Sequence, residues 1–281
     1  MILVTGATGT VGREVLRRLP ADLAVRIMAR DPARVTGAPS AAETVHGDFT
    51  DPASLTSALQ GVHTALLVTN PDGDDDRRFL DPARAAGVRH VVKLSAAAVA
   101  DPGAQDLITR RQRHNEDLLR GSGMHWTLLR PRAFMSNTLS WARSIRTDGV
   151  VRALYGTSVN ACVDPRDVAE IAARALTEPG HEGRAHTLTG PEPLGAADQT
   201  ALLAELLGRP LRFEELTPHQ ARAALGARYP AEIADALLES AERQRAGSKT
   251  TVDATLPHLL GRPARTFRTW AHDHLDAFAG L

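Results

Sequence analysis

Short apolar segments alternate with amphipathic helical patterns over the first 130 residues of the chain. Such alternation is typical of βαβ units, in which helices bury both faces of a parallel sheet. The segments of strand character are residues 1–5, 24–29, 43–46, 63–69, 90–95 and 125–130. The segments of helical character are residues 10–19, 51–60, 74–87 and 105–121. The sequence therefore predicts an α/β fold built on a doubly wound parallel sheet.

The alternation weakens after residue 131. The segments expected beyond this point are helices over residues 136–149 and 163–180, and strands over residues 184–190 and 211–216. From residue 195 onward the remaining pattern is mostly helical. We therefore expect a first domain over residues 1–150 and a smaller, mostly helical C-terminal lobe over residues 151–281, partly interleaved with the sheet.

Charge and cysteine content restrict the partners and the location that we expect. Lys and Arg total 33, as do Asp and Glu, so the formal net charge is zero and gives no bulk attraction to nucleic acid. No run of 18 uncharged apolar residues is present, so we expect no membrane partner. The single cysteine, Cys162, excludes an internal disulfide and fits a reducing cytoplasm. His272 and His274 are two residues apart and face different sides of a helix, so we expect no metal site there.

Three glycines follow the first apolar segment directly. Gly6, Gly9 and Gly12 form the pattern G-x-x-G-x-x-G between a predicted strand and a predicted helix. In that context, glycines allow a tight turn and let backbone N–H groups approach a pyrophosphate. The pattern predicts a dinucleotide-binding domain of the Rossmann type. The alternative is an ordinary connection between a strand and a helix.

Two arginines indicate which dinucleotide binds. Arg30 closes the second predicted strand, and Arg34 follows one helical turn later. A carboxylate at this position binds a ribose 2′-hydroxyl, whereas a cation accommodates a 2′-phosphate. The sequence therefore favours NADP over NAD, and two guanidinium groups can converge on one phosphate. The alternative is that Arg30 pairs with Asp31 or faces solvent.

Asp48 and Phe49 end the third predicted strand. A carboxylate and an aromatic ring at this position could flank an adenine. The same two residues could instead form a helix-capping turn and part of the core.

Several motifs together resemble one family. The motifs are VTGATGTVGREV, MARDPARV, GDFTDPASL, VKLSAAAV and SGMHWTLLRPRAFMSN. In order and spacing they resemble the NmrA-like branch of the atypical short-chain dehydrogenase/reductases, which includes NADPH-dependent quinone oxidoreductases. The resemblance covers residues 1–190 well and the remainder loosely. It implies an NAD(P)-binding domain over residues 1–150 and a substrate lobe over residues 151–281.

The resemblance also implies a role for individual residues. The residues that would surround the pyrophosphate of NADPH are Gly6, Thr8, Gly9, Thr10, Val11 and Gly12. Arg30 would bind the 2′-phosphate, and Asp48 and Phe49 would flank the adenine. The residues that would line the nicotinamide side are Thr69, Asn70, Ser95 and Pro131. Each of these last four ends a predicted strand, where ligands of open parallel sheets bind.

The usual proton donor of short-chain dehydrogenases is missing. Those enzymes carry a tyrosine and a lysine four residues apart on the helix after the fifth strand. Neither residue type occurs in residues 105–121; the two tyrosines are Tyr155 and Tyr229, and Lys93 lies in a predicted strand. Members of the branch often have a histidine or a lysine where this chain has Gln112. General acid catalysis at that position is therefore in doubt.

The polar residues on the helix 105–121 supply other candidates. His114 is the strongest local acid or base, because the unperturbed pKa of histidine is near neutrality. We expect His114 and Gln112 to orient or protonate the acceptor, and Ser95 to help present the nicotinamide. The alternative is that Arg111 and His114 face a subunit partner or an internal carboxylate. Glu116 is expected in a structural ion pair.

The leading hypothesis is an NADPH-dependent oxidoreductase that transfers hydride to a quinone, an enone or a ketone. The substrate is expected to be a small aromatic or conjugated molecule, and aromatic natural-product metabolism is one setting. A quinone can take its proton from water, so the missing pair does not exclude reduction. The alternative is an NmrA-like redox sensor that binds NADP without turnover. A homodimer is possible for either.

Overall fold

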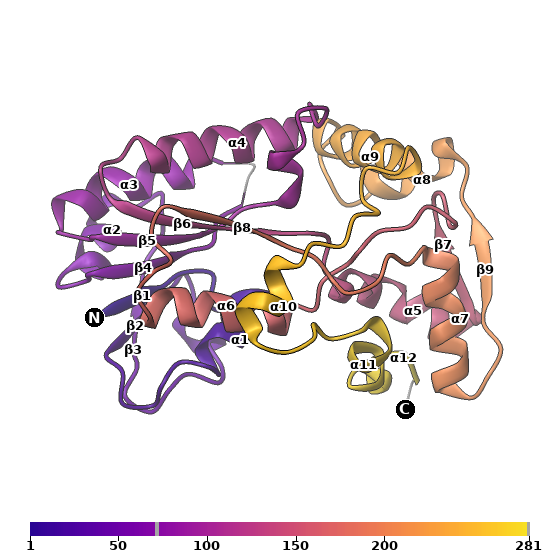
Figure 1. Ribbon diagram of the computed structural model, residues 1–281, viewed down its shortest axis with the longest axis horizontal. Helices are drawn as coiled ribbons and strands as arrows, with labels where there is room; N and C mark the ends of the chain where they lie inside the picture. Colours follow the sequence, from indigo (N-terminus) through magenta and orange to yellow (C-terminus); the bar gives the residue numbers. More distant parts are fainter. Residues whose placement is uncertain (71–72, 280–281) are drawn as a thin grey trace. The chain divides into compact units, whose positions relative to one another are not determined.

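The computed structural model describes residues 1–70 and 73–279, and its largest element is a seven-stranded sheet (Figure 1). The strands are β1 Ile2–Val4, β2 Val25–Ala29, β3 Glu43–His46, β4 Thr64–Leu67, β5 His90–Leu94, β6 His125–Pro131 and β8 Arg184–Leu188. Their order across the sheet is β3-β2-β1-β4-β5-β6-β8, and the pairs from β3 to β6 are all parallel. The chain moves outward from β1 to β3 and then returns to β4. Ligands of open α/β sheets bind at such a reversal, outside the carboxyl ends of the strands.

Helices cover both faces of this sheet (Figure 1). One face carries α1 Thr10–Leu16 and α6 Pro165–Thr177, which contact each other. The other carries α2 Pro52–Leu59, α3 Asp75–Ala85 and α4 Leu107–Arg120. The buried cluster beneath the second group includes Leu3, Leu55, Leu67, Phe79, Leu119 and Leu128. Helices thus bury both faces of the sheet, as strands of a parallel sheet require. This arrangement confirms the predicted doubly wound α/β fold.

The chain forms two compact units, and each unit consists of three segments that are separate in the sequence. The Rossmann unit consists of residues 1–100, 109–131 and 165–187. The second unit consists of residues 101–108, 132–164 and 188–281. Residue 150, the expected domain boundary, lies inside the second unit.

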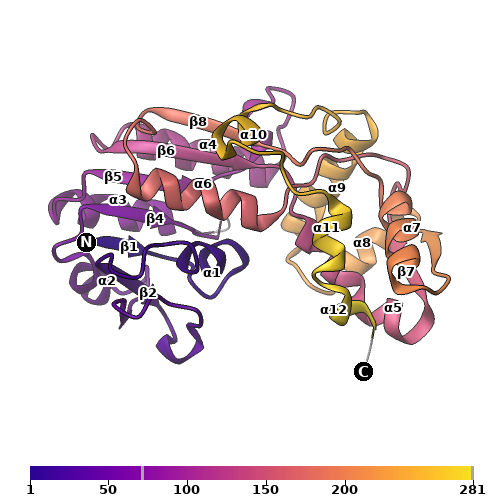
Figure 2. The same cartoon turned by 60° about the horizontal axis from the view of Figure 1, so that its bottom comes forward.

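The second unit is mostly helical and has its own core (Figure 2). Its helices are α5 Ala142–Asp148, α7 Ala196–Leu207, α8 Pro218–Gly226, α9 Ala231–Arg245, α10 Thr255–Leu260, α11 Phe267–His272 and α12 Leu275–Ala279. Trp270 is buried at the centre of the core, stacked on Phe267 with ring centroids 5.7 Å apart and edge-on to Phe278. Such aromatic contacts fix the last two helices against α5 and α7.

One strand of the second unit was not predicted. β7 Val150–Ala153 pairs in parallel with β9 Arg212–Glu215, the strand expected over residues 211–216. β7 has only four residues, and its partner lies some sixty positions away, so local sequence gives little sign of it. The helix expected over residues 136–149 is also divided, into a 3-10 helix over Met135–Trp141 and α5.

The other short elements are 3-10 turns over Pro32–Arg34 and Ala97–Ala100. In the part of the chain that the structure describes, no helix has both the length and the apolar character needed to span a membrane.

Candidate functional site

The loop between β1 and α1 requires glycine at two of the three positions of the G-x-x-G-x-x-G pattern. Gly6 has φ +64°, and a Cβ there would lie 2.7 Å from the Cβ of Val68. A Cβ on Gly12 would lie 2.2 Å from the carbonyl oxygen of Gly6, closer than any real contact. The Gly9 N–H donates to that same oxygen at 2.9 Å and closes the turn. The loop therefore has no room for a side chain at Gly6 or Gly12, and adding one at either position would force the backbone to move.

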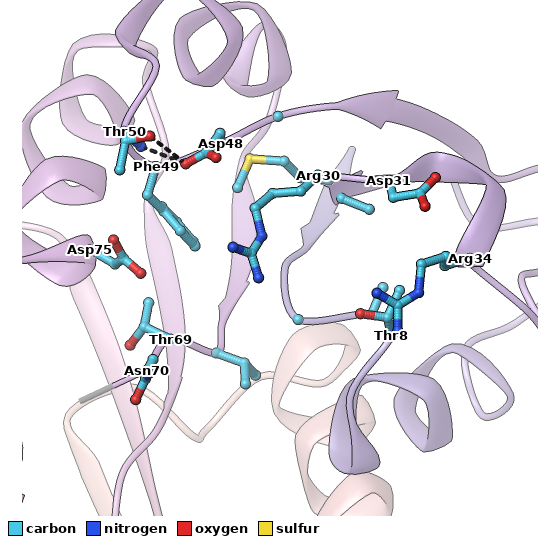
Figure 3. Close-up of a pocket in the computed structure, with 16 residues that line it drawn as sticks. Thr8, Arg30, Asp31, Arg34, Asp48, Phe49, Thr50, Thr69, Asn70 and Asp75 are labelled. Carbon is cyan, nitrogen blue, oxygen red and sulfur yellow. Dashed lines mark hydrogen bonds between the residues drawn. The ribbon is translucent and has the colours of Figure 1, made fainter. Parts of the chain in front are cut away.

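A pocket of about 740 Å³ opens beside this loop, over the carboxyl ends of β1, β2 and β4 (Figure 3). Of the residues that the sequence singles out, the pocket is lined by Gly6, Thr8, Arg30, Arg34, Asp48, Phe49, Thr69 and Asn70. The predicted site residues that do not line it are Gly9, Thr10, Val11, Gly12, Ser95, Gln112, His114 and Pro131. Gly9 and Thr10 begin α1 and are exposed, whereas Val11 and Gly12 are buried within the first turn.

Arg30 and Arg34 both line the pocket and bring two positive charges to it (Figure 3). Both side chains are exposed. No ion pair joins Arg30 to Asp31 in the described part of the chain; Asp31 instead accepts a hydrogen bond from the N–H of Ala33 at 3.2 Å. The guanidinium of Arg30 is therefore available to an anion in the pocket.

Asp48 and Phe49 face the same hollow (Figure 3). The Asp48 carboxylate accepts two hydrogen bonds of 2.8 Å from Thr50, one from its N–H and one from its hydroxyl. These bonds, with the nearby charge of Arg30, lower the pKa of Asp48. Phe49 also packs edge-on against Phe79, so it belongs both to the pocket and to the margin of the core. The cap of α2 is made by Asp51, not by Asp48.

The strand ends beside the pocket carry Thr69, Asn70, Ser95 and Pro131, as the sequence predicts. Thr69 and Asn70 follow β4, Ser95 follows β5, and Pro131 ends β6. Because β4, β5 and β6 are neighbours, these residues share one edge of the sheet.

A family model described as NAD(P)H-binding matches residues 6–179 of the chain. The chain belongs to this NAD(P)H-binding family. The match covers the glycine loop, the pocket and strands β2 to β6 of the sheet.

Individual relatives establish the kind of chemistry. The chain is 58% identical over 280 residues to the (4-alkanoyl-5-oxo-2,5-dihydrofuran-3-yl)methyl phosphate reductase of Streptomyces griseus, with 99% of each chain covered. It is 38% identical over 284 residues to the NAD(P)H azoreductase of Xenophilus azovorans, again with 99% of each covered. The solved structure of an Escherichia coli NADPH-dependent quinone oxidoreductase complexed with NADPH matches with a TM-score of 0.85 and 29% identity, covering 98% of this chain and 99% of that one.

The chain is therefore an NAD(P)H-dependent reductase that acts on a small molecule, and NADP(H) is its cofactor. The predicted family, activity and cofactor are confirmed. The residues present fit the cofactor: the bare glycine loop leaves room for a pyrophosphate, and the arginine pair supplies charge for a further phosphate.

A buried polar network lies next to the strand ends of this reductase. Lys93 of β5 and Asp76 of α3 form an ion pair, and their side chains are 0% and 1% exposed. Asp76 also accepts hydrogen bonds from the Thr69 hydroxyl at 2.6 Å and the Asn115 amide at 3.1 Å. The sequence pattern alone assigns Lys93 no role in the site. A lysine inside a strand that is buried on both faces needs a charged partner. The position of Lys93 in a predicted strand could therefore have indicated a buried ion pair.

Ser95 contacts a second buried carboxylate in the reductase. Its hydroxyl donates to Glu116 at 2.6 Å, and the guanidinium of Arg130 donates two hydrogen bonds to the same carboxylate. Burial alone would raise the pKa of Glu116, but the bonds from Arg130 and Ser95 and the charge of Arg120 hold it below its ordinary value. Glu116 thus makes the structural ion pair that we expected, and it positions Ser95.

The two candidates on α4 lie on different faces of the helix. Gln112 is buried, and its amide oxygen has no hydrogen-bond partner among the described residues. His114 is exposed, with its Nε2 3.5 Å from a guanidinium nitrogen of Arg77. In the described part of the chain, no three His, Cys, Asp or Glu side chains gather closely enough to hold a metal ion.

Proposed function

We propose that NADPH binds along the carboxyl edge of the sheet, with its adenine end in the pocket. The residues proposed to surround the pyrophosphate are Gly6, Thr8, Gly9, Thr10, Val11 and Gly12. Arg30 and Arg34 bind the 2′-phosphate, and Asp48 and Phe49 flank the adenine. Thr69, Asn70, Ser95 and Pro131 line the nicotinamide. The main support for placing the adenine end of NADPH in the pocket is that Arg30 and Arg34 both line it (Figure 3).

The proposed substrate is a conjugated butenolide that carries an acyl group and a phosphomethyl group. The support is the relative that is 58% identical along nearly the whole chain and is named for reduction of (4-alkanoyl-5-oxo-2,5-dihydrofuran-3-yl)methyl phosphate. In such a ring the carbon–carbon double bond is conjugated to a lactone carbonyl and to a ketone. Its carbon bearing the phosphomethyl group is electrophilic and can accept a hydride.

NADPH, when bound, would supply a hydride, and with it both electrons, to the ring carbon that bears the phosphomethyl group. The double bond then opens, and its electron pair becomes an enolate shared between the lactone and ketone oxygens. A proton taken up at the acyl-bearing carbon completes the reduction. Because two carbonyl groups stabilise this enolate, the reaction needs no strong acid beside it, which agrees with the absence of a tyrosine and lysine pair on α4.

Residues of α4 and β5 have supporting roles in this proposal. Gln112 is buried, and its amide oxygen has no hydrogen-bond partner among the described residues. In this proposal the amide N–H of Gln112 donates to a carbonyl oxygen of the acceptor and so orients it. Ser95 is held by Glu116 and helps present the nicotinamide face. His114 is exposed and delivers the proton through solvent rather than by direct contact.

The test is to mix the purified protein with NADPH and the phosphorylated acyl butenolide and to follow loss of dihydronicotinamide absorbance. We expect turnover with this substrate and a product saturated in the ring, identified by mass spectrometry. A simple quinone serves as a comparison acceptor. Tight NADPH binding without turnover on either acceptor would contradict the proposal and favour the redox-sensor alternative.

The homodimer and the cytoplasmic location remain predictions. Sedimentation analysis tests the homodimer, and fractionation of the producing cells tests the cytoplasmic location.

A further inference from the structure

Arg132 and Lys249, two cationic side chains of the second unit, are partly buried and have no ionic partner among residues 1–70 and 73–279. The Nε atom of Arg132 is fully buried and has no hydrogen-bond partner in the described part of the chain. The amine of Lys249 donates to the hydroxyl of Ser240 at 2.8 Å. Among the described residues, no carboxylate forms an ion pair with either cation, although removing a charge from water normally requires such a partner.

Backbone hydrogen bonds bring these two residues into one region. The segment 160–163 lies between the chain after β6 and the chain around Lys249. In this segment the Val163 N–H donates to the carbonyl oxygen of Ala133 at 2.9 Å, and the Ala161 N–H donates to that of Lys249 at 3.1 Å. Separately, the Arg132 N–H donates to the carbonyl oxygen of Leu188 at 2.8 Å. Arg132 and Lys249 are thus fixed by main-chain pairing rather than by chance contact of long side chains.

The charge of Arg132 acts on the amine of Lys249. Burial, and then the positive charges of Arg243 and Arg132, lower the pKa of Lys249 to about 8. Arg243 is itself neutralised by Asp106 at 2.7 Å. Burial also lowers the pKa of Arg132. The region therefore holds two mutually repelling cations, and an anion between them would stabilise both.

Carboxylates near Arg132 are engaged elsewhere. Asp101 and Asp253 act on Arg132 only through their charge, which is outweighed by its burial. Asp101 accepts a hydrogen bond from the N–H of Gly103 at 2.9 Å, and Asp253 accepts one from the N–H of Thr255 at 2.7 Å. The thiol of Cys162 is also close, but burial raises its pKa to about 11, so it supplies no negative charge.

We propose that Arg132 and Lys249 bind the phosphate of the substrate. A phosphomonoester dianion matches this site, because a guanidinium and an ammonium both donate to phosphate oxygens. Arg132 is also the residue next to Pro131, which ends the strand assigned to the nicotinamide side. This inference rests on the proposed function, since it concerns the phosphate of the same substrate.

The experiment compares two acyl butenolides that differ only in a phosphate or a hydroxyl on the methyl group. The variants are Arg132→Ala and Lys249→Gln, with Lys249→Arg as the conservative variant and the exposed Arg228→Ala as the matched control. We expect each of the first two variants to lower kcat/KM for the phosphorylated substrate by roughly tenfold or more, the scale of a lost charge-assisted contact. For Arg132→Ala and Lys249→Gln we expect unchanged kcat/KM with the hydroxymethyl substrate and an unchanged NADPH dissociation constant. We expect Lys249→Arg and Arg228→Ala to retain nearly all of the preference for the phosphorylated substrate.

The outcomes separate the two proposals. If the unmodified enzyme reduces neither butenolide, the proposed function fails. If it prefers the phosphorylated substrate and both variants keep that preference, the proposed function stands and the phosphate site is refuted. A loss of NADPH affinity in the variants, with the preference retained, would assign the cations to the cofactor and also overturn the inference. As a measurement independent of variant folding, inorganic phosphate should inhibit the unmodified enzyme competitively against the phosphorylated substrate; absence of inhibition would count against the site.

Discussion

Lys93 and Asp76 form an ion pair in which both side chains are almost completely buried, beside the strand ends proposed for the nicotinamide. The pair connects β5 to α3, and through Thr69 and Asn115 it also connects the end of β4 to α4. The position of Thr69 at the pocket therefore depends on charges that solvent does not reach.

Removing one partner of this pair should be costly. Lys93→Met leaves the Asp76 carboxylate buried without its cation, and we expect the free energy of unfolding to fall by about 3 kcal/mol or more. Adding Asp76→Asn removes the remaining charge and should restore part of that loss. Urea denaturation measures both, with the exposed Arg89→Ala as the control. A Lys93→Met protein as stable as the unmodified one would show that the pair contributes little.

The glycine loop gives a prediction about steric room. In Gly12→Ala the new methyl group would lie 2.2 Å from the Gly6 carbonyl oxygen, so the loop must shift. We expect NADPH affinity to fall by about tenfold or more, because a displaced loop no longer presents its N–H groups to the pyrophosphate. Gly226→Ala, where nothing lies within 4 Å of the added carbon, is the matched control and should leave binding unchanged. Fluorescence titration with NADPH provides the measurement.

Cofactor choice should depend on Arg30. Arg30→Asp replaces a cation in the pocket with an anion, and we expect it to weaken NADPH binding by about 1–2 kcal/mol or more while leaving NADH binding little changed. Arg89→Asp makes the same charge change near the opposite ends of the strands, just before β5, and controls for net charge. Equal losses of NADPH affinity in the two variants would refute a specific role for Arg30.

The pKa of Lys249 predicts how substrate preference varies with pH. The amine is protonated below its pKa of about 8 and neutral above it. As pH rises through that value, kcat/KM for the phosphorylated butenolide should fall, since this ratio reports ionisations of the free enzyme. The hydroxymethyl substrate should show no such fall. Lys249→Arg keeps its charge at high pH and should remove the decline; an identical profile in this variant would exclude Lys249 as the titrating group.

The sequence alone was sufficient to predict the Rossmann sheet and the cofactor. β1 and the glycines at positions 6, 9 and 12 are contiguous, so one short window contains the strand, the turn and the start of the helix. Arg30 ends the next strand and could be located by counting. Local pattern is enough here because short-range sterics decide where a bare backbone is needed, and alternating apolar segments decide that helices cover both faces of a sheet.

Only the tertiary structure decided which polar groups meet. Asp76 and Lys93 lie on two different elements, α3 and β5, and Arg132 and Lys249 are far apart in the chain; no periodicity joins either pair. β7 likewise finds its partner in β9 only after folding. Buried charges take partners from whichever elements pack against them, so their pairing and their pKa values follow from long-range packing, which a linear pattern does not contain.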